Sequence, residues 1–191
     1  HNNFNLGGDI MSPRFDIDSY RANFQGGARS YLFYYKPVFP SSIGASSEIA
    51  TYLVRTTSLP ETNIDDIPLA WQGFDFKVAG KYTYSDWNVT FNCDADANIQ
   101  KYFHQWMALI HDPTTNVYSN PANYMMDQQL ELLGLTGSPI MKYKLFACWP
   151  KMIGNATLDY SQNDVIQFDI TFTYLYHVTD KATYGVAPTF G

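Results

Sequence analysis

Apolar and polar side chains alternate along much of this chain, which is the pattern of β-strands with one buried face. The clearest alternation runs over residues 165–176, and others run over 74–84 and 86–93. One face of the first segment carries Ile166, Phe168, Ile170, Phe172, Tyr174 and Tyr176. Burial of these side chains, at roughly 1.5–3 kcal/mol each, contributes on the order of 10 kcal/mol as an upper value and fixes the register of the strand. Hydrophobic runs at 31–39 and 48–57 predict two more strands.

One segment has the period of a helix instead. Its apolar residues follow the i, i+3, i+4, i+7 spacing of an amphipathic helix over about residues 95–112; they are Ile99, Tyr102, Phe103, Trp106, Met107 and Ile110. Asp94 or Asp96 can cap the N-terminus, and Pro113 ends the helix after Asp112.

The remaining segments predict loops and a hairpin. Residues 112–127 are polar and contain two prolines, which predicts a loop. Residues 128–149 predict a hairpin with its turn at Gly137-Ser138-Pro139, and the alternative is a helix over 122–133 closed by Gly134. Many strands with one amphipathic helix indicate a β-barrel or sandwich with a helix packed against it.

The two ends of the chain differ from the middle. Residues 1–30 are polar and glycine-rich, so we expect an N-terminal arm that Phe15 and Phe24 could dock against a neighbour. We expect one folded domain over 31–178 and a C-terminal tail over 179–191.

Composition narrows the possible functions. Only 16% of the 191 residues are charged, whereas 17% are aromatic, including 15 Tyr and 13 Phe. So many aromatic side chains suggest burial between subunits as well as within one. A net charge of −6 argues against tight binding of nucleic acid phosphates. We expect Cys93 and Cys148 to be buried free thiols, and we expect neither a membrane span nor a secretory signal.

No motif predicts catalysis or a cofactor. Asp94-Ala-Asp96-Ala-Asn98 resembles the first half of a calcium-binding loop, but Ile99 and Gln105 occupy the positions that need Gly and Glu. Helix capping is the better interpretation of this segment. His104 and His111 share a helix face without a Cys or Glu at ligand spacing, so we expect no metal site. We therefore expect a protein that is not an enzyme.

An ordered set of short segments resembles a known family. The set comprises Tyr52–Glu61, Ile64–Pro68, Phe76–Lys81, Tyr84–Thr90, the helix Asn98–Trp106, Ala147–Pro150, Leu158–Tyr160, Asn163–Asp164 and Ile166–Tyr174. In this order, over about residues 30–177, the chain resembles the tail tube proteins of T4-like contractile phages, a tube family shared with contractile injection systems. No single segment is diagnostic, and the order of the whole set makes the resemblance specific.

The resemblance implies a fold and an assembly. The fold is two packed antiparallel sheets that form a small barrel with one flanking helix at about 95–112. The subunits form hexameric rings, and the rings stack into a hollow conduit for DNA ejection. The implied partners are the tail sheath, the baseplate or tube initiator, the tail terminator and the tape measure protein. Genomic DNA passes through without tight binding, and the protein belongs to the virion tail, assembled in the host cytoplasm.

The same resemblance supplies candidate residues for self-assembly. The family-matched positions are Leu59, Pro60, Pro68, Gly80, Trp87, Trp149 and Pro150. We expect the segment Leu59 to Trp87 to reach the adjacent ring; an ordinary connection followed by a hairpin is the alternative. Trp87 and Trp106 also fit positions in the core.

A polar channel wall would let DNA slide, because a basic wall would hold each phosphate. The polar faces of two predicted strands fit such a wall, with Asn88, Thr90, Gln167, Asp169, Thr171 and Thr173 as lumen candidates. They fit a solvent-facing sheet equally well. Alternative functions are a tube protein of a bacterial injection system, a baseplate tube initiator, or a monomeric β-barrel that binds a small molecule in its aromatic interior.

Overall fold

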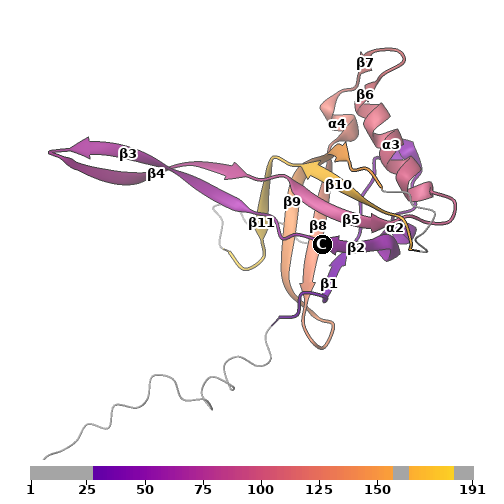
Figure 1. The fold of residues 1–191 in the computed structure, drawn as a ribbon, viewed down its shortest axis with the longest axis horizontal. Coiled ribbons are helices and arrows are strands. Elements are labelled where there is room, and N and C mark those ends of the chain that lie inside the picture. Colours follow the sequence, from indigo (N-terminus) through magenta and orange to yellow (C-terminus); the bar gives the residue numbers. More distant parts are fainter. Residues whose placement is uncertain (1–27, 157–163, 183–191) are drawn as a thin grey trace, which may run out of the picture.

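The computed structural model describes residues 28–156 and 164–182. Most of the predicted arm, the matched residues Leu158–Tyr160 and Asn163, and the end of the predicted tail lie outside the described residues. The described chain is mainly β, as the sequence predicts, with a main sheet, a long hairpin that projects from it and a few helices (Figure 1).

The main sheet has seven antiparallel strands in the order β1-β8-β9-β10-β5-β2, with β11 also paired to β9. The strands are β1 (Phe33–Tyr35), β2 (Val54–Thr57), β5 (Trp87–Asn92), β8 (Met126–Leu133), β9 (Pro139–Ile153), β10 (Gln167–Thr173) and β11 (Tyr176–Thr179). The edges of this path are β1 and β2, which do not pair with each other in the described residues. Antiparallel sheets are thus present as predicted, whereas the described strands do not form a closed barrel.

Strand β9 joins two parts of the sheet. Its first half pairs with β8 on one edge and with β11 on the other, and its last residues pair with β10. Between these halves Ala147 has a φ of 55°, a left-handed conformation that interrupts the regular strand. The bend separates a β1-β8-β9-β11 layer from a β9-β10-β5-β2 layer.

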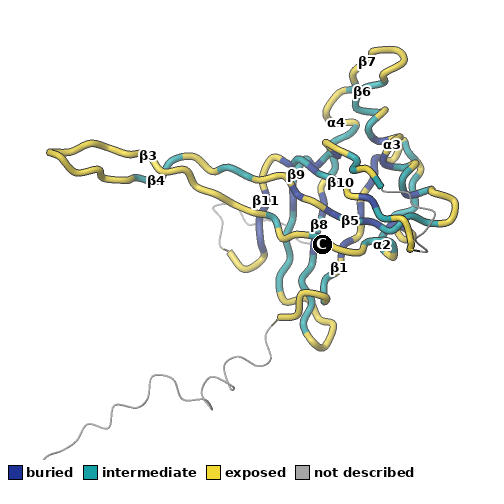
Figure 2. The backbone as a smooth tube through the Cα atoms, viewed as in Figure 1, coloured by how far each residue is buried: buried dark blue, intermediate teal, exposed yellow. Residues whose placement is uncertain are grey.

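Helix α3 (Asn98–Ile110) covers the inner face of β5 and β10. Its buried residues are Ile99, Phe103 and Trp106, as the helical period predicts. The ring of Phe103 lies 5.1 Å from that of Phe91 and 6.0 Å from that of Phe172, measured between centroids. An aromatic cluster between α3 and the sheet is therefore the centre of the core. Buried residues gather on these elements in Figure 2.

The start of α3 confirms the predicted cap. The Asp94 carboxylate accepts a hydrogen bond from the Ile99 backbone N–H at 3.1 Å. Ala97, at the N-cap position, has a φ of 53° and provides no side-chain cap, so Asp94 satisfies this helix end from outside. The helix is shorter than the predicted 95–112, because His111–Asp112 form β6 and pair with β7 (Val117–Tyr118).

The strand predicted at 48–57 is wrong over its first half, where helix α2 (Ser47–Leu53) forms before β2 begins. Ser46 caps this helix by accepting a hydrogen bond from the Ile49 N–H at 3.5 Å, and Glu48 lies in the first turn. These local signals, together with burial of Ala50, outweigh the hydrophobic run that predicted a strand.

The hairpin predicted at 128–149 is confirmed, and the alternative helix at 122–133 is wrong. Only one helical turn, α4 (Pro121–Tyr124), precedes β8. The contacts of Gln128 favour a strand over a helix in this segment. Its buried side chain accepts hydrogen bonds from the Tyr35 hydroxyl at 2.9 Å and the Val38 N–H at 3.0 Å, which ties β8 to the segment after β1.

Two predicted strands are shorter than expected. In the 31–39 segment only Phe33–Tyr35 forms a strand, because Pro37 and Pro40 follow and the helix η1 (Ser41–Ile43) begins there. The 165–176 strand ends at Thr173, and Tyr176 belongs to β11, where it pairs with Phe146.

Candidate interaction surfaces

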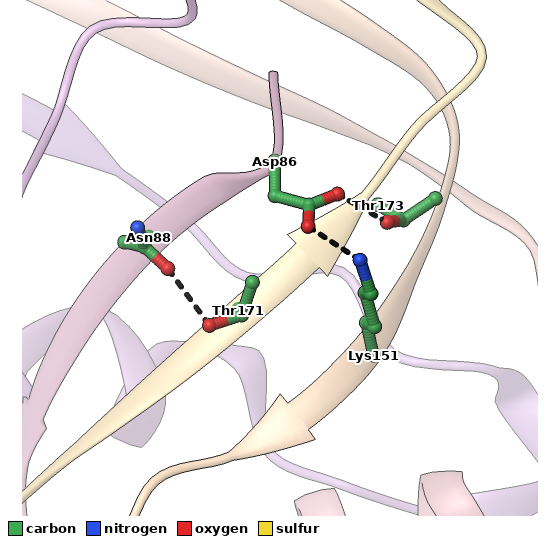
Figure 3. Close-up of polar contacts among 5 residues, drawn as sticks. All are labelled: Asp86, Asn88, Lys151, Thr171 and Thr173. Atoms are coloured by element: carbon green, nitrogen blue, oxygen red, sulfur yellow. Dashed lines mark hydrogen bonds and ion pairs between the residues drawn. The ribbon is translucent and has the colours of Figure 1, made fainter. Parts of the chain in front are cut away.

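The side of β5 and β10 away from α3 is polar. In the antiparallel register Asn88 lies opposite Thr171, Thr90 opposite Asp169, and Asn92 opposite Gln167. The Thr90 hydroxyl donates to the Asp169 carboxylate at 2.6 Å. The Thr171 hydroxyl donates to the Asn88 side-chain oxygen at 2.8 Å (Figure 3). All six lumen candidates therefore share one surface, which we call the polar face.

Two charged residues that were not among the lumen candidates complete the polar face. Asp86 accepts a hydrogen bond from Lys151 at 2.7 Å and another from the Thr173 hydroxyl at 2.6 Å (Figure 3). These hydrogen bonds, first that from Lys151 and then that from Thr173, hold the pKa of Asp86 below its ordinary value. Lys151 comes from the end of β9, so only the pairing of β9 with β10 brings it to this face.

The polar face therefore offers few free positive charges. The hydroxyls of Thr90 and Thr171 donate to Asp169 and Asn88, and Lys151 is paired with Asp86. Asp169 contributes a further carboxylate, which is exposed. Such a surface offers phosphates few cations that could displace counterions.

The second surface is the projecting hairpin of β3 (Thr62–Trp71) and β4 (Phe74–Tyr84) (Figures 1 and 2). Gln72 and Gly73 have φ angles of 46° and 86°, which matches the two-residue turn that fits the twist of a hairpin. Three cross-strand pairs put large apolar groups on one face of the hairpin; they are Ile67 with Val78, Leu69 with Phe76, and Trp71 with Phe74.

The described residues 28–156 and 164–182 leave the apolar face of this hairpin almost uncovered. Trp71 is 70% exposed, Phe74 is 79% exposed and Phe76 is 63% exposed. On the other face Asp66 and Lys77 form an ion pair. A contiguous exposed apolar surface of this kind is a candidate site for a protein–protein contact.

Gly80 is required by the shape of the hairpin. A Cβ at this position would lie 2.9 Å from the Asp65 carbonyl oxygen and 3.0 Å from Cγ1 of Ile67. The register of β3 against β4 also shifts between Ile64 and Asp66. Gly80 thus permits the close approach of the two strands at this irregularity.

The other family-matched positions lie at the root of the hairpin, within β3 or in the body. Leu59 is exposed and Pro60 half-buried at the entry to β3, and Pro68 is exposed within β3. Trp87 and Pro150 are buried, and Trp149 is half-buried. The indole N–H of Trp87 donates to the Ser58 carbonyl at 2.8 Å, so this core residue holds the strand that leads into the hairpin.

His177 lies at the base of the hairpin, and no feature of the sequence indicated its role. Its Nε2 is 3.0 Å from the Thr62 hydroxyl at the start of β3, and its buried Nδ1 has no hydrogen-bond partner. The rings of Tyr84, Tyr174 and Tyr143 surround it at centroid distances of 5.4, 5.8 and 6.1 Å. Burial lowers the pKa of His177, because the charged imidazolium loses solvation there.

This environment predicts a loss of stability in acid. The unfolded chain takes up a proton at His177 near the ordinary pKa of about 6.5, whereas the folded chain does so only at lower pH. The free energy of unfolding should therefore fall as pH decreases from about 6.5 toward the lower pKa of the folded state. Urea unfolding at pH 7.5 and pH 5.5 measures this loss. A His177→Gln variant should lose less stability than the parent over the same interval; an equal loss would assign the pH dependence to other groups.

The described residues contain no cluster that could hold a metal. Residues 28–156 and 164–182 bring no three His, Cys, Asp or Glu side chains together in such a group. The Nε2 atom of His111 instead lies 2.9 Å from the Asn116 side-chain oxygen, and its ring stacks on Tyr118.

Cys93 and Cys148 are free thiols, of which Cys148 is buried and Cys93 half-buried. None of the helices in this part of the chain is long and apolar enough to span a membrane.

Sequence comparisons find matches over most of the chain. A family model described as phage tail tube protein matches residues 19–180. The tail tube protein gp19 of Enterobacteria phage T4 is 24% identical over 142 residues, which is 73% of this chain and 87% of that protein. The corresponding protein of Enterobacteria phage T6 is 23% identical over the same length and coverage.

Solved structures of contractile assemblies contain similar chains. A chain in the cryo-EM structure of the anti-feeding prophage baseplate has a TM-score of 0.61 at 12% identity, covering 80% of this chain and 94% of that one. A chain in the extended sheath–tube complex of the PVC contractile injection system has a TM-score of 0.54 at 14% identity, covering 87% and 98%. At these identities the likeness establishes a common fold.

Proposed function

Because the chain belongs to the phage tail tube protein family, it is a structural subunit of a virion tail tube, and we propose that it forms hexameric rings that stack into a conduit for DNA. The polar face of β5 and β10 carries this proposal. Its residues would line the channel, where hydrogen-bonded hydroxyl and amide groups and a paired lysine offer DNA little to bind.

The strand edges supply a means of ring closure. Strands β1 and β2 are the ends of the main sheet in the described chain, and an unpaired edge can accept a strand from a neighbour. Sideways pairing of such edges around a rotation axis would give a continuous inner β-barrel. The division into an arm (1–30), a tube domain (31–178) and a tail (179–191) is also part of this proposal.

The hairpin would connect one subunit to another along the tube. It places an exposed apolar surface far from the body, and stacking of rings needs a heterologous contact of this kind. The tail sheath, the baseplate or tube initiator, the tail terminator and the tape measure protein complete the set of proposed partners. No part of this function requires a reaction, a metal or a cofactor.

A ligand-binding barrel is a weaker explanation of the same aromatic residues. Phe91, Phe103 and Phe172 are each 0% exposed, and helix α3 packs directly on the inner face of the sheet. The space that a ligand would need is therefore occupied by side chains of the protein itself.

Electron microscopy of the purified chain, with a sizing column, tests the proposed assembly. We expect rings or hollow tubes of uniform width, formed either spontaneously or after addition of purified baseplates as nuclei. A chain that stays monomeric at high concentration even with baseplates present would contradict the proposal.

An Asp169→Lys substitution tests the channel assignment. Because Asp169 is exposed on the polar face, the variant should fold and form tubes, but its ring of added positive charges should retard DNA. Phage particles that carry the variant should eject DNA more slowly than the parent in a time-resolved ejection assay. Asp169→Asn is the matched control, since it removes the carboxylate without adding a cation. Parent-like kinetics in the lysine variant would remove Asp169 from the channel wall.

A further inference from the structure

The end of β9 contains an irregularity that places a lysine on the polar face. Met152 lies opposite Thr171 of β10, but Pro150 lies opposite Phe172, the very next residue of β10. Lys151 is therefore an extra residue between two successive pairs, which is the arrangement of a β-bulge. A bulge changes the direction of side chains along the strand that contains it.

The packing of β9 on the core accounts for this bulge. Pro150 is buried and Ile153 packs against the core, although residues three apart in a regular strand point to opposite faces. The extra residue lets both point inward. Lys151 and Met152, which lie between them, are exposed. Core packing thus brings a cation to a surface whose other named residues are uncharged or acidic.

Asp86 is placed to receive this cation. It immediately precedes β5, and the pairing of Trp87 with Phe172 puts it beside Thr173. One oxygen of its carboxylate accepts a hydrogen bond from the Lys151 Nζ at 2.7 Å, and the other accepts one from the Thr173 hydroxyl at 2.6 Å (Figure 3). Thr173 therefore orients the carboxylate, whose second oxygen is left to bind the ammonium group.

A lysine without this carboxylate would be a potential phosphate-binding group. Among the residues of β2, β5, β10 and 149–153, only Arg55 and Lys151 are basic. Arg55 lies on the edge strand β2, whereas Lys151 lies beside β10 in the interior of the sheet. In a tube the same lysine would repeat in every subunit of every ring. Each free ammonium group could bind a DNA phosphate by displacing a counterion, so the repeated attraction would be large.

We propose that Asp86 neutralises Lys151 on the channel wall, and that Thr173 is the positioning residue for the Asp86 carboxylate. This inference rests on the proposed function, because it requires the polar face to line the channel. An exposed ion pair adds little to the stability of a fold. The value of this pair lies instead in removing a free cation from the path of the DNA.

An Asp86→Asn substitution in phage particles tests this role. The variant keeps the shape of the side chain but leaves Lys151 without its carboxylate, and we expect DNA ejection to slow by about tenfold or more. Combining it with Lys151→Gln should restore the parent's rate, because the double variant has the parent's net charge and no free lysine. Failure of Lys151→Gln to restore the rate would overturn the proposal.

Asp169→Asn is the charge-matched control. It removes one carboxylate from the same face without releasing a cation, so it should slow ejection much less than Asp86→Asn does. Equal slowing by the two variants would mean that total charge, and not the release of Lys151, determines the rate, which would contradict the proposal.

The salt dependence of ejection separates a freed lysine from a distorted tube. A lysine–phosphate contact releases counterions, so added monovalent salt weakens it. The ratio of the parent's rate to that of Asp86→Asn, compared at equal salt, should therefore approach one as salt rises. A ratio that is independent of salt would show that the variant acts through the structure of the tube, and the proposal would be wrong.

The outcomes also separate this inference from the proposed function. Failure of the unmodified chain to form tubes even with baseplates present would overturn both. Tubes in which Asp169→Lys retards DNA but Asp86→Asn does not would overturn the role of the ion pair alone and leave the proposed function intact.

Amine labelling tests the ion pair on the unassembled subunit, so it applies even to a variant that forms no tubes. Brief treatment with acetic anhydride and peptide mass spectrometry give the labelling of Lys151 relative to that of Lys101, an exposed residue of α3. This ratio should rise by about two- to fivefold in Asp86→Asn, the range that a pair of this exposure allows, and by less in Thr173→Val. An unchanged ratio in Asp86→Asn would show that Asp86 does not hold Lys151, which would overturn the proposal.

Discussion

Replacing Trp71 and Phe74 together by serine is expected to abolish tube assembly and to leave the subunit folded. The two side chains are 70% and 79% exposed, so their removal costs the isolated subunit little packing. In an assembled tube they would be central aromatic anchors, and truncation of such an anchor costs about 2 kcal/mol or more per contact. Because the contact repeats at every subunit, the effect on a long polymer is much larger than on a single pair.

Tube yield by negative-stain microscopy and the sedimentable fraction measure this effect, and circular dichroism checks the fold. Ala70→Ser combined with Lys77→Ser is the matched control, since both residues lie on the same hairpin but on the face opposite Trp71 and Phe74. The control should assemble like the parent. Normal tubes from the Trp71 and Phe74 double variant would show that these two side chains do not hold subunits together.

A Phe103→Ala substitution should have the largest effect on the subunit itself. Phe103 is fully buried, and its ring lies near Phe39, Phe91 and Phe172 at centroid distances of 5.3, 5.1 and 6.0 Å. Deletion of such a ring leaves a cavity and costs about 3–5 kcal/mol. Since a typical domain is stable by about 5–15 kcal/mol, this loss is a large fraction of the total.

Chemical denaturation of the monomeric subunit gives the free energy of unfolding for this comparison. Phe103→Leu keeps most of the volume and should cost less than about 1.5 kcal/mol. A similar small loss for the alanine variant would mean that the aromatic cluster between α3 and the sheet is not the main source of stability.

Local pattern predicted the elements that position the polar face. In β5 and β10 a period of two puts Trp87, Val89 and Phe91 into the core and leaves Asn88 and Thr90 outside. The same argument applies to α3, whose period of 3.6 selected its buried residues. These predictions succeed because the periodicity of a single strand or helix is enough to tell which of its side chains share the buried face.

Other features depend on which elements meet, and here local pattern was insufficient or misleading. The hydrophobic run before β2 gave no sign that Ser46 would cap a helix. The described part of the subunit leaves the apolar side chains of β3 and β4 largely exposed. In β3 and β4 a period-two pattern therefore indicates a strand without indicating what covers it. The covering surface belongs to another molecule in our proposal.

Side-chain period and the order of the matched segments were enough to identify a mainly β tube protein with one core helix, because both are properties of the amino-acid chain alone. The bend of β9 at Ala147, which brings Lys151 to Asp86, becomes known only from the folded chain. The same holds for the contact of His177 with Thr62 at the base of the hairpin, and for the projection of the hairpin away from the side where α3 lies. These contacts join residues far apart in the chain, so they follow from strand pairing and layer packing, which no local pattern specifies.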